Sequence, residues 1–421
     1  MHPKRNVLLV ALAASVFVAA SSPAHTQAAL DPTAEFFDDS VVHDLKLWIN
    51  SRDWETLKTN FLSNAYYPAD FQWKTTTVRN VGIRSRGNGS RSGFKPGLRV
   101  DIDRYSSTQK FLDLKSFVLR NNTQDPSQMH EWLSMLFFRR MGLPASREAY
   151  ARLFVNNEYA GLYTIVESVD KSFLTRQFGE DSGYLFDYDY PVDAAPFYFE
   201  DRGRDAASYV PLPFKPETRE NNARPEVIAD MVQAINASTG ATFRTAVAEF
   251  IDLGQFIRHV AAEVFLAEQD GVIGDWGMNN FFMYRPELSN RFRLIVWDKS
   301  QAFVQGQAYS IWHNITDVPD ANRNRLMNRA IEYPDLRSLY LETLLEAGRA
   351  ASEVPPGTLP GDTRGWLERE IDRAYALISP SVLADIVKPY TNDEFVASVE
   401  ALRVFARERT AFVNGEVAAS R

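Results

Sequence analysis

The spacing of apolar residues changes along this 421-residue chain, and the change limits the folds that the chain can adopt. In the first third, apolar and polar residues alternate in short runs separated by turns, a pattern typical of β-strands. The predicted strands are 41–49, 78–84, 98–102, 116–120, 151–155 and 161–166. Asn156-Asn157 is predicted to turn between the last two, and one helix is predicted at 127–141.

The second half of the chain is predicted to be mainly helical. Its predicted elements are helices at 225–237, at 250–268 and over most of 323–421, and a strand pair at 280–284 and 292–297. Residues 187–224, which are rich in proline, acidic and aromatic residues, are predicted to form a long excursion. Strands first and helices later indicate an α+β protein, and this pattern alone leaves several architectures open.

The amino terminus has the order of charge and polarity of a secretory signal peptide. Lys4 and Arg5 precede an apolar run at 6–20, and small residues that suit cleavage follow, up to Ala29. A membrane anchor is the alternative, but it needs about 20 apolar residues, and Ser-Ser-Pro at 21–23 ends this run. We predict that residues 1–29 are a signal peptide and that the mature protein is secreted, to the periplasm or beyond, without a transmembrane anchor.

Charge and residue usage exclude several classes of function. Removing Lys4 and Arg5 takes the formal net charge from −8 to −10, which argues against a general nucleic-acid surface. The absence of cysteine excludes a disulfide scaffold, an iron–sulfur cluster and a thiol nucleophile. The six histidines are scattered, so we expect any metal to be a hard cation held by carboxylate and amide oxygens.

Three clusters of residues could carry chemistry. The first is a glycine- and serine-rich segment at 84–99 whose backbone amides and five cations could approach an anion. An exposed basic hairpin is the alternative interpretation. The five cations are Arg84, Arg86, Arg91, Lys95 and Arg99.

The second cluster, 270–280, lies between a long apolar helix and an aromatic strand. Asp275 and Asn280 are five residues apart, which is the spacing of the aspartate and asparagine in the protein-kinase catalytic loop. A turn rich in Asp, Asn and Gly is the alternative. The third cluster is Trp297-Asp298, where a carboxylate follows a buried strand.

These segments resemble, in order, the motifs of the spore-coat protein H (CotH) kinase family. RGNGSR at 86–91 with Phe94-Lys95 is similar to that family's glycine-rich loop and lysine. Further matches are the strand–NN–xDPS passage at 114–127, the hairpin and VE-x-x-D segment at 151–174, DG…NNFFMY at 270–284, and IVWD at 295–298. The resemblance covers about 36–412.

The resemblance implies an atypical bilobal protein-kinase-like fold and transfer of phosphate from ATP to protein serine. The β-rich amino-terminal lobe would be 30–170 and the helical carboxy-terminal lobe 171–421. ATP and Mg²⁺ or Mn²⁺ would be the cofactors, and an unidentified protein the substrate. Other members of the family bind host receptors at cell surfaces, so a non-catalytic surface or envelope protein is the alternative.

The resemblance also implies roles for individual residues. Asp298 and Asn280 match the metal ligands. Arg86, Lys95 and Arg99 match the nucleotide-contacting segment, and Glu167 lies where a kinase has its hinge.

The catalytic aspartate stays open between two residues. The Asp-Gly context favours Asp270, whereas the spacing to Asn280 favours Asp275. Two departures from the family pattern bear on activity. Ser300 stands where WDxD has its second carboxylate, and Pro96 stands where a second lysine is usual.

Overall fold

The computed structural model describes residues 31–189, 195–319 and 323–421, and 33–421 form one compact unit. The predicted signal peptide, 1–29, lies outside the described residues. Within the described part, no helix is both long and apolar enough to cross a membrane.

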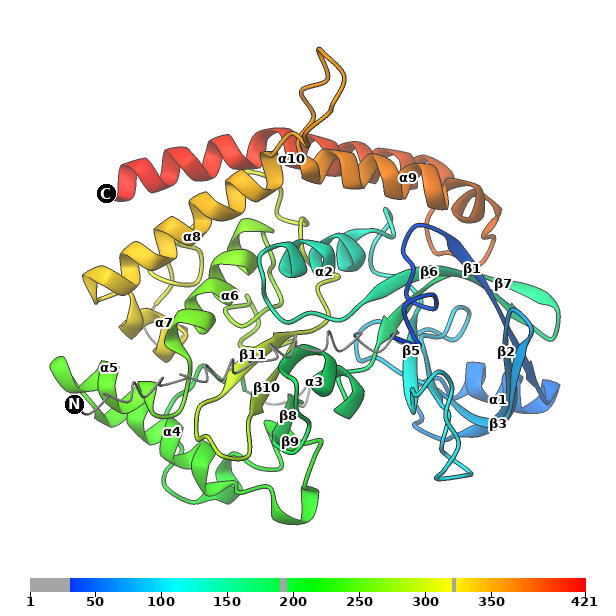
Figure 1. The fold of residues 1–421 in the computed structure, drawn as a ribbon, viewed down its shortest axis with the longest axis horizontal. Helices are drawn as coiled ribbons and strands as arrows, with labels where there is room; N and C mark the ends of the chain where they lie inside the picture. Colours follow the sequence, from blue (N-terminus) through cyan, green and yellow to red (C-terminus); the bar gives the residue numbers. More distant parts are fainter. Residues whose placement is uncertain (1–30, 190–194, 320–322) are drawn as a thin grey trace, which may run out of the picture. The chain divides into compact units, whose positions relative to one another are not determined.

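The strands of the first third close into a barrel in the order β1-β2-β3-β4-β5-β7-β6 (Figure 1). Their bounds are β1 Val42–Ile49, β2 Tyr67–Trp73, β3 Thr76–Ser85, β4 Leu98–Asp101, β5 Ser116–Arg120, β6 Glu148–Val155 and β7 Glu158–Glu167. Neighbouring strands are antiparallel except β1 and β6, whose parallel pairing closes the barrel. Rings of Phe36, Phe71, Phe111 and Phe117 pack against one another in a buried core.

Two helices accompany the barrel, α1 (Ser51–Thr59) and α2 (His130–Arg140). The start of α2 is fixed by the buried carboxylate of Asp125, which accepts hydrogen bonds from the backbone N–H groups of Met129 (2.7 Å) and His130 (2.8 Å). These bonds satisfy backbone N–H groups at the start of the helix, which have no acceptor within the helix itself. The Asp-Pro-Ser passage therefore ends the turn after β5 and starts α2.

The rest of the chain carries a second sheet, of order β11-β10-β8-β9. Its strands are β8 Tyr184–Tyr188, β9 Phe214–Pro216, β10 Phe281–Arg285 and β11 Arg293–Val296. The pair β10–β11 was predicted, but β8 and β9 were not. The expected excursion at 187–224 therefore contains the end of β8 and all of β9, and its residues Phe197, Phe199 and Tyr209 are buried in the main core.

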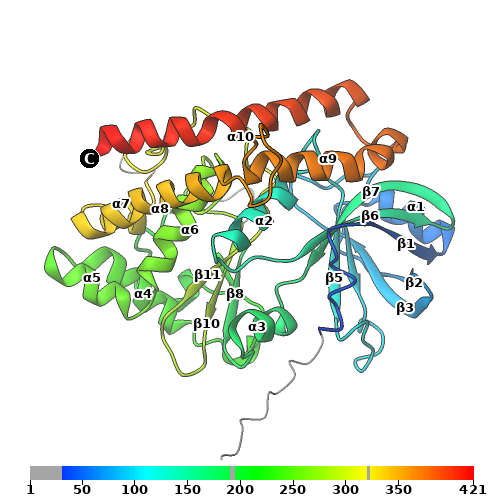
Figure 2. The same cartoon turned by 45° about the horizontal axis from the view of Figure 1, so that its top comes forward.

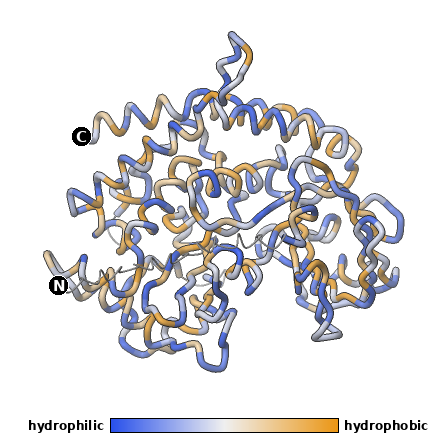
Figure 3. Tube along the Cα trace, in the orientation of Figure 1, coloured by the Kyte–Doolittle hydropathy of each residue, from blue (hydrophilic) through white to orange (hydrophobic). Residues whose placement is uncertain are grey.

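Helices dominate the second half, as the periodicity predicts (Figure 2). The α-helices that follow the barrel are α3 Lys171–Phe178, α4 Glu226–Ala237, α5 Ala241–Ala248, α6 Leu253–Phe265, α7 Arg325–Ala330, α8 Pro334–Ser352, α9 Trp366–Ala384 and α10 Asn392–Ser420. Helix α8 packs on α6, α9 packs on α2 and β7, and α10 packs on both α8 and α9. Apolar residues are spread through the barrel strands and the helices alike (Figure 3).

A small apolar cluster joins the two sheets. Val118 of β5 and Val166 of β7 pack in it with Phe282, Ile295 and Trp297 from the β10–β11 hairpin. The hairpin is thereby fixed against the barrel wall, with its Trp297 end next to β5. The order of elements confirms an α+β fold with strands first and helices later, while the lobe boundary at 170/171 stays a prediction.

Candidate functional site

Asn280 and Asp298 lie at the same end of the β10–β11 hairpin. Phe281 pairs with Val296 in the antiparallel ladder, so the residue before β10 and the residues after β11 meet there. Asn280 (φ 58°) and Asp298 (φ 46°) both have left-handed backbones. Asparagine and aspartate adopt this conformation more readily than other residues with a Cβ, because their short polar side chains can hydrogen-bond locally.

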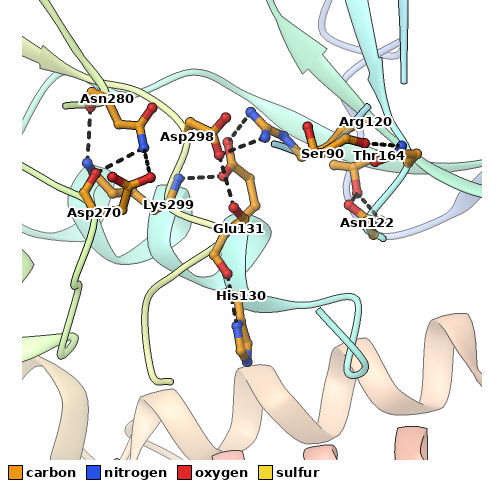
Figure 4. A network of polar contacts seen from close by, with 12 residues as sticks. Ser90, Arg120, Asn122, His130, Glu131, Thr164, Asp270, Asn280, Asp298 and Lys299 are labelled. Atoms are coloured by element: carbon orange, nitrogen blue, oxygen red, sulfur yellow. Dashed lines mark hydrogen bonds and ion pairs between the residues drawn. The ribbon is translucent and has the colours of Figure 1, made fainter. Parts of the chain in front are cut away.

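Asp270 completes this group (Figure 4). Its carboxylate accepts hydrogen bonds from the side-chain amides of Asn279 (3.0 Å) and Asn280 (2.9 Å). Burial raises the pKa of Asp270 to about 6, the hydrogen bond from Asn279 opposes the rise, and the nearby Asp298 charge adds to it. Asp270 therefore stays mainly ionised at neutral pH, within reach of protonation under mildly acidic conditions.

Arg120, the last residue of β5, supplies the cation nearest to Asp298. Its guanidinium lies 2.7 Å from Asp298 and 3.1 Å from Glu131 of α2. Burial tends to raise the pKa of Asp298, but Arg120 outweighs it and holds that pKa below the usual value. The buried Nε of Arg120 has no hydrogen-bond partner among the described residues. A small hollow beside Arg120 is lined by Ser90 and Ser300 and also by the acidic residues Asp125 and Glu131.

Arg86 is a second cation near Asp298. Its guanidinium stacks 5.4 Å from the ring centre of Trp297, the residue before Asp298. Burial and the neighbouring Arg120 lower the pKa of Arg86 to about 10, so it remains charged at neutral pH. The glycine-rich segment thus brings one of its five cations to the site.

A buried ion pair between Lys299 and Glu263 holds two loops of the site together. Lys299 Nζ lies 2.8 Å from Glu263 of α6 and donates to the backbone carbonyl of Asn280 (3.0 Å). Glu263 also accepts a hydrogen bond from the N–H of Val272 (2.9 Å). Because one carboxylate contacts both Lys299 and the segment after Asp270, the pair fixes the two aspartate-bearing loops relative to each other.

The structure does not bring Lys95 to this group, which corrects the prediction that it contacts phosphate oxygens. Its ammonium group is fully buried and lies 2.7 Å from Asp385 at the end of α9. A lysine enclosed in this way cannot reach a ligand beside Asp298.

Glu167 and Arg99 also have protein partners. The buried Glu167 carboxylate forms ion pairs with Arg147 (2.7 Å) and Arg176 (2.6 Å), so its side chain is not available to a nucleotide. Arg99 donates to the Ser116 hydroxyl (3.1 Å) on the neighbouring strand.

Asp275 lies apart from the Asp270 group. It accepts hydrogen bonds from the Asn314 side-chain amide (2.7 Å) and lies 2.6 Å from His313 Nε2. These contacts tie it to the segment after β11, whereas Asp270 contacts Asn280 directly. The geometry therefore favours Asp270 as the aspartate that acts with Asn280 and Asp298.

Four charged residues that contact the site, Arg120, Glu131, Glu263 and Lys299, were not among the predicted site residues. Arg120 and Glu131 flank the NN–xDPS passage, and Lys299 directly follows Asp298. Glu263 is an acidic residue on a buried helical face, four residues after His259. A charged residue within an apolar element is rarely buried unless it is paired, so each could have been marked as a candidate.

The donor set suits a hard divalent cation in its chemistry. Asp298 offers a carboxylate, and Asn280 uses its amide N–H on Asp270, which leaves its amide oxygen as an acceptor. Such oxygens are the ligands of Mg²⁺, which is held by one or two carboxylates together with substrate phosphates and water. Among the described residues, no group of three or more His, Cys, Asp or Glu could hold a metal by itself.

Comparisons with known proteins agree with the motifs. The chain is 22% identical over 373 residues to inner spore coat protein H of Bacillus subtilis, covering 87% of this chain and 95% of that protein. It is 27% identical over 190 residues to invasin CotH3 of Rhizopus delemar, covering 41% of this chain and 29% of the invasin.

A solved structure, the Helicobacter pylori proinflammatory kinase CtkA, aligns over 80% of this chain and 95% of its own, with 8% identity and a TM-score of 0.34. A likeness this low supports no argument. The family model for CotH kinase protein, however, matches residues 83–413, which is more than half of the sequence. The chain therefore belongs to the CotH kinase protein family.

Proposed function

We propose that this chain is a secreted protein kinase that transfers phosphate from ATP to protein serine with Mg²⁺ or Mn²⁺. The observation that carries the proposal is the meeting of Asp270, Asn280 and Asp298 beside the buried cation Arg120. Phosphoryl transfer needs such a set, because a cation must lie near the phosphates, oxygen ligands must hold a metal and a carboxylate must orient the nucleophile.

Each residue has a role in this proposal. Asp298 and Asn280 would hold the divalent cation, which when bound neutralises charge on the phosphate oxygens. Arg120, whose Nε has no hydrogen-bond partner in the described part of the chain, takes the phosphate-binding role that was predicted for Lys95. Asp270 accepts the proton of the serine hydroxyl and orients its oxygen, a task suited to a carboxylate with a pKa of about 6.

The larger arrangement is part of the same proposal. The barrel and the helical part would act as the two lobes of a kinase-like fold, with the site where β5 meets the β10–β11 hairpin. Residues 1–29 would direct export, and a protein, not a nucleic acid, would be the substrate.

Autophosphorylation of the mature protein with labelled ATP and Mg²⁺ tests the activity. Asp270→Asn should lower the rate by about 100-fold or more while Mg–ATP binding persists, because the change removes the charge that orients the hydroxyl. Asp275→Asn is the matched control and should lower it only modestly. The opposite ranking would assign the base to Asp275 and contradict the geometric choice.

A non-catalytic binding protein is the second candidate, and Ser300 favours it. Its hydroxyl donates to Asp298 (3.1 Å) at the position where the family's WDxD pattern has a further carboxylate. One carboxylate fewer would weaken the hold on a divalent cation. If the wild-type protein transfers no phosphate and Ser300→Asp does not restore transfer, this candidate replaces the kinase.

A further inference from the structure

The glycine-rich loop between β3 and β4, residues 86–97, needs an anchor to present Arg86 to the site. Its two ends are joined by the hydrogen bond from Arg86 N–H to the Gly97 carbonyl (2.9 Å). Inside the loop, the Asn121 side-chain amide donates to the carbonyls of Ser90 (2.9 Å) and Lys95 (2.8 Å). Asn121 directly follows Arg120, so these bonds connect the loop to the strand end that carries the other cation of the site.

The anchor on the opposite side is Asp385, which caps the end of α9. Its Oδ2 lies 2.7 Å from Lys95 Nζ and accepts from the Leu162 N–H (3.0 Å) of β7, while its Oδ1 accepts from the Val387 N–H (3.0 Å). The side chains of Lys95 and Asp385 are both fully buried. The two carboxylate oxygens thus bind the loop, a barrel strand and the segment after α9 together.

The barrel is shaped to admit this carboxylate. Gly161 has φ +114°, and a Cβ there would lie 2.6 Å from Asp385 Oδ2. The Tyr163 hydroxyl donates to the Pro96 carbonyl (3.2 Å), next to the lysine. Further along the same segment, the Tyr390 hydroxyl donates to the Thr123 carbonyl, just after the Asn121 contact.

Stability alone does not account for a fully buried pair. Apolar residues of similar volume often replace such pairs at no cost in stability, because desolvation offsets the attraction between the charges. What the pair can add is a fixed geometry, since a buried ammonium group needs a charge partner and Asp385 lies 2.7 Å from it.

We propose that Lys95 and Asp385 are positioning residues. Through them, the segment between α9 and α10 (385–391) fixes the loop 86–97 and sets the affinity of the site for nucleotide phosphates. This inference rests on the proposed function for the identity of the ligand. The anchoring of the loop itself does not depend on that function.

The test uses the full mature chain with the double substitution Lys95→Met and Asp385→Asn. Methionine keeps the length of the lysine stem, and asparagine keeps the size of the aspartate and one of its two acceptor oxygens, so the variant should fold. Hydrogen exchange in the loop 86–97 should become at least about 10-fold faster. The Kd for Mg–ATP should rise about 10-fold.

Val399→Ala, a truncation in the buried face of α10, is the control for general destabilisation. It should leave both the loop exchange and the Kd unchanged. Unchanged loop exchange in the double variant, or a Kd within twofold of wild type despite faster exchange, would overturn the proposal. If the wild-type protein itself binds no Mg–ATP, the proposed function fails, and the exchange measurement alone decides whether the pair positions the loop.

Discussion

Replacing Glu263 with glutamine should destabilise the protein by about 3 kcal/mol at neutral pH. Burial tends to raise the pKa of Glu263, but the charges of Lys299 and His259 outweigh it and lower that pKa from 4.5 to about 2. At about 1.4 kcal/mol per unit of pKa, this shift corresponds to about 3 kcal/mol of folding stability. The same range follows independently, because removing one partner of a buried ion pair costs about 3–5 kcal/mol.

The pH dependence of the effect follows from the direction of the change. A carboxyl group with a lowered pKa in the folded state contributes fully above its unfolded pKa, 4.5, and loses that contribution as the pH falls toward 2. Urea unfolding of wild type and Glu263→Gln between pH 3 and 7 measures the difference directly. The difference should be constant above about pH 5 and should fall by about 2 kcal/mol between pH 4.5 and 3. A difference below about 1 kcal/mol at pH 7, or one that grows as the pH falls, would refute the reasoning.

Asp298→Ala should weaken Mg²⁺-dependent nucleotide binding by more than about 100-fold, the upper range for losing an outer-sphere partner of a metal, with calorimetry as the assay. Asn280→Ala should cost only about 10-fold in the same assay, because a neutral amide attracts a dication less than a carboxylate does. Arg120→Met should raise the KM for ATP about 10-fold or more, by loss of one charge-assisted hydrogen bond, and an unchanged KM would remove Arg120 from the phosphate-binding role. If the missing carboxylate limits the activity of the wild-type protein, Ser300→Asp should increase phosphate transfer and tighten Mg²⁺ binding. Weaker Mg²⁺ binding in this variant would contradict the reasoning.

The local sequence pattern predicted the elements whose residues all favour the same structure, a strand or a turn. The strand at 116–120 has the predicted bounds, and the turn at Asn156-Asn157 joins β6 to β7 as expected, with φ of 51° and 70°. The strand β2 was missed because Pro68 and Asp70 disfavour a strand in isolation. Pairing with β1 and β3 on both sides overrides that preference.

The site was predictable where sequence neighbours are also spatial neighbours. Asn280 and Asp298 flank one hairpin, so the antiparallel pairing of its two strands brings them to the same end. Lys95 was misplaced because the density of cations in a loop does not tell which side of the barrel each side chain faces. Its partner, Asp385, lies 290 residues away, a separation across which one sequence gives no sign of contact.

The parallel pairing that closes the barrel has a consequence for the order of folding. Val42 of β1 pairs with Tyr150 of β6, 108 residues later, so one edge of β1 has no partner until more than a third of the chain is available. Contacts between residues so far apart form slowly, because a long loop must close before any of them is made. During synthesis the barrel therefore stays open, with an unpaired strand edge that invites pairing with other chains.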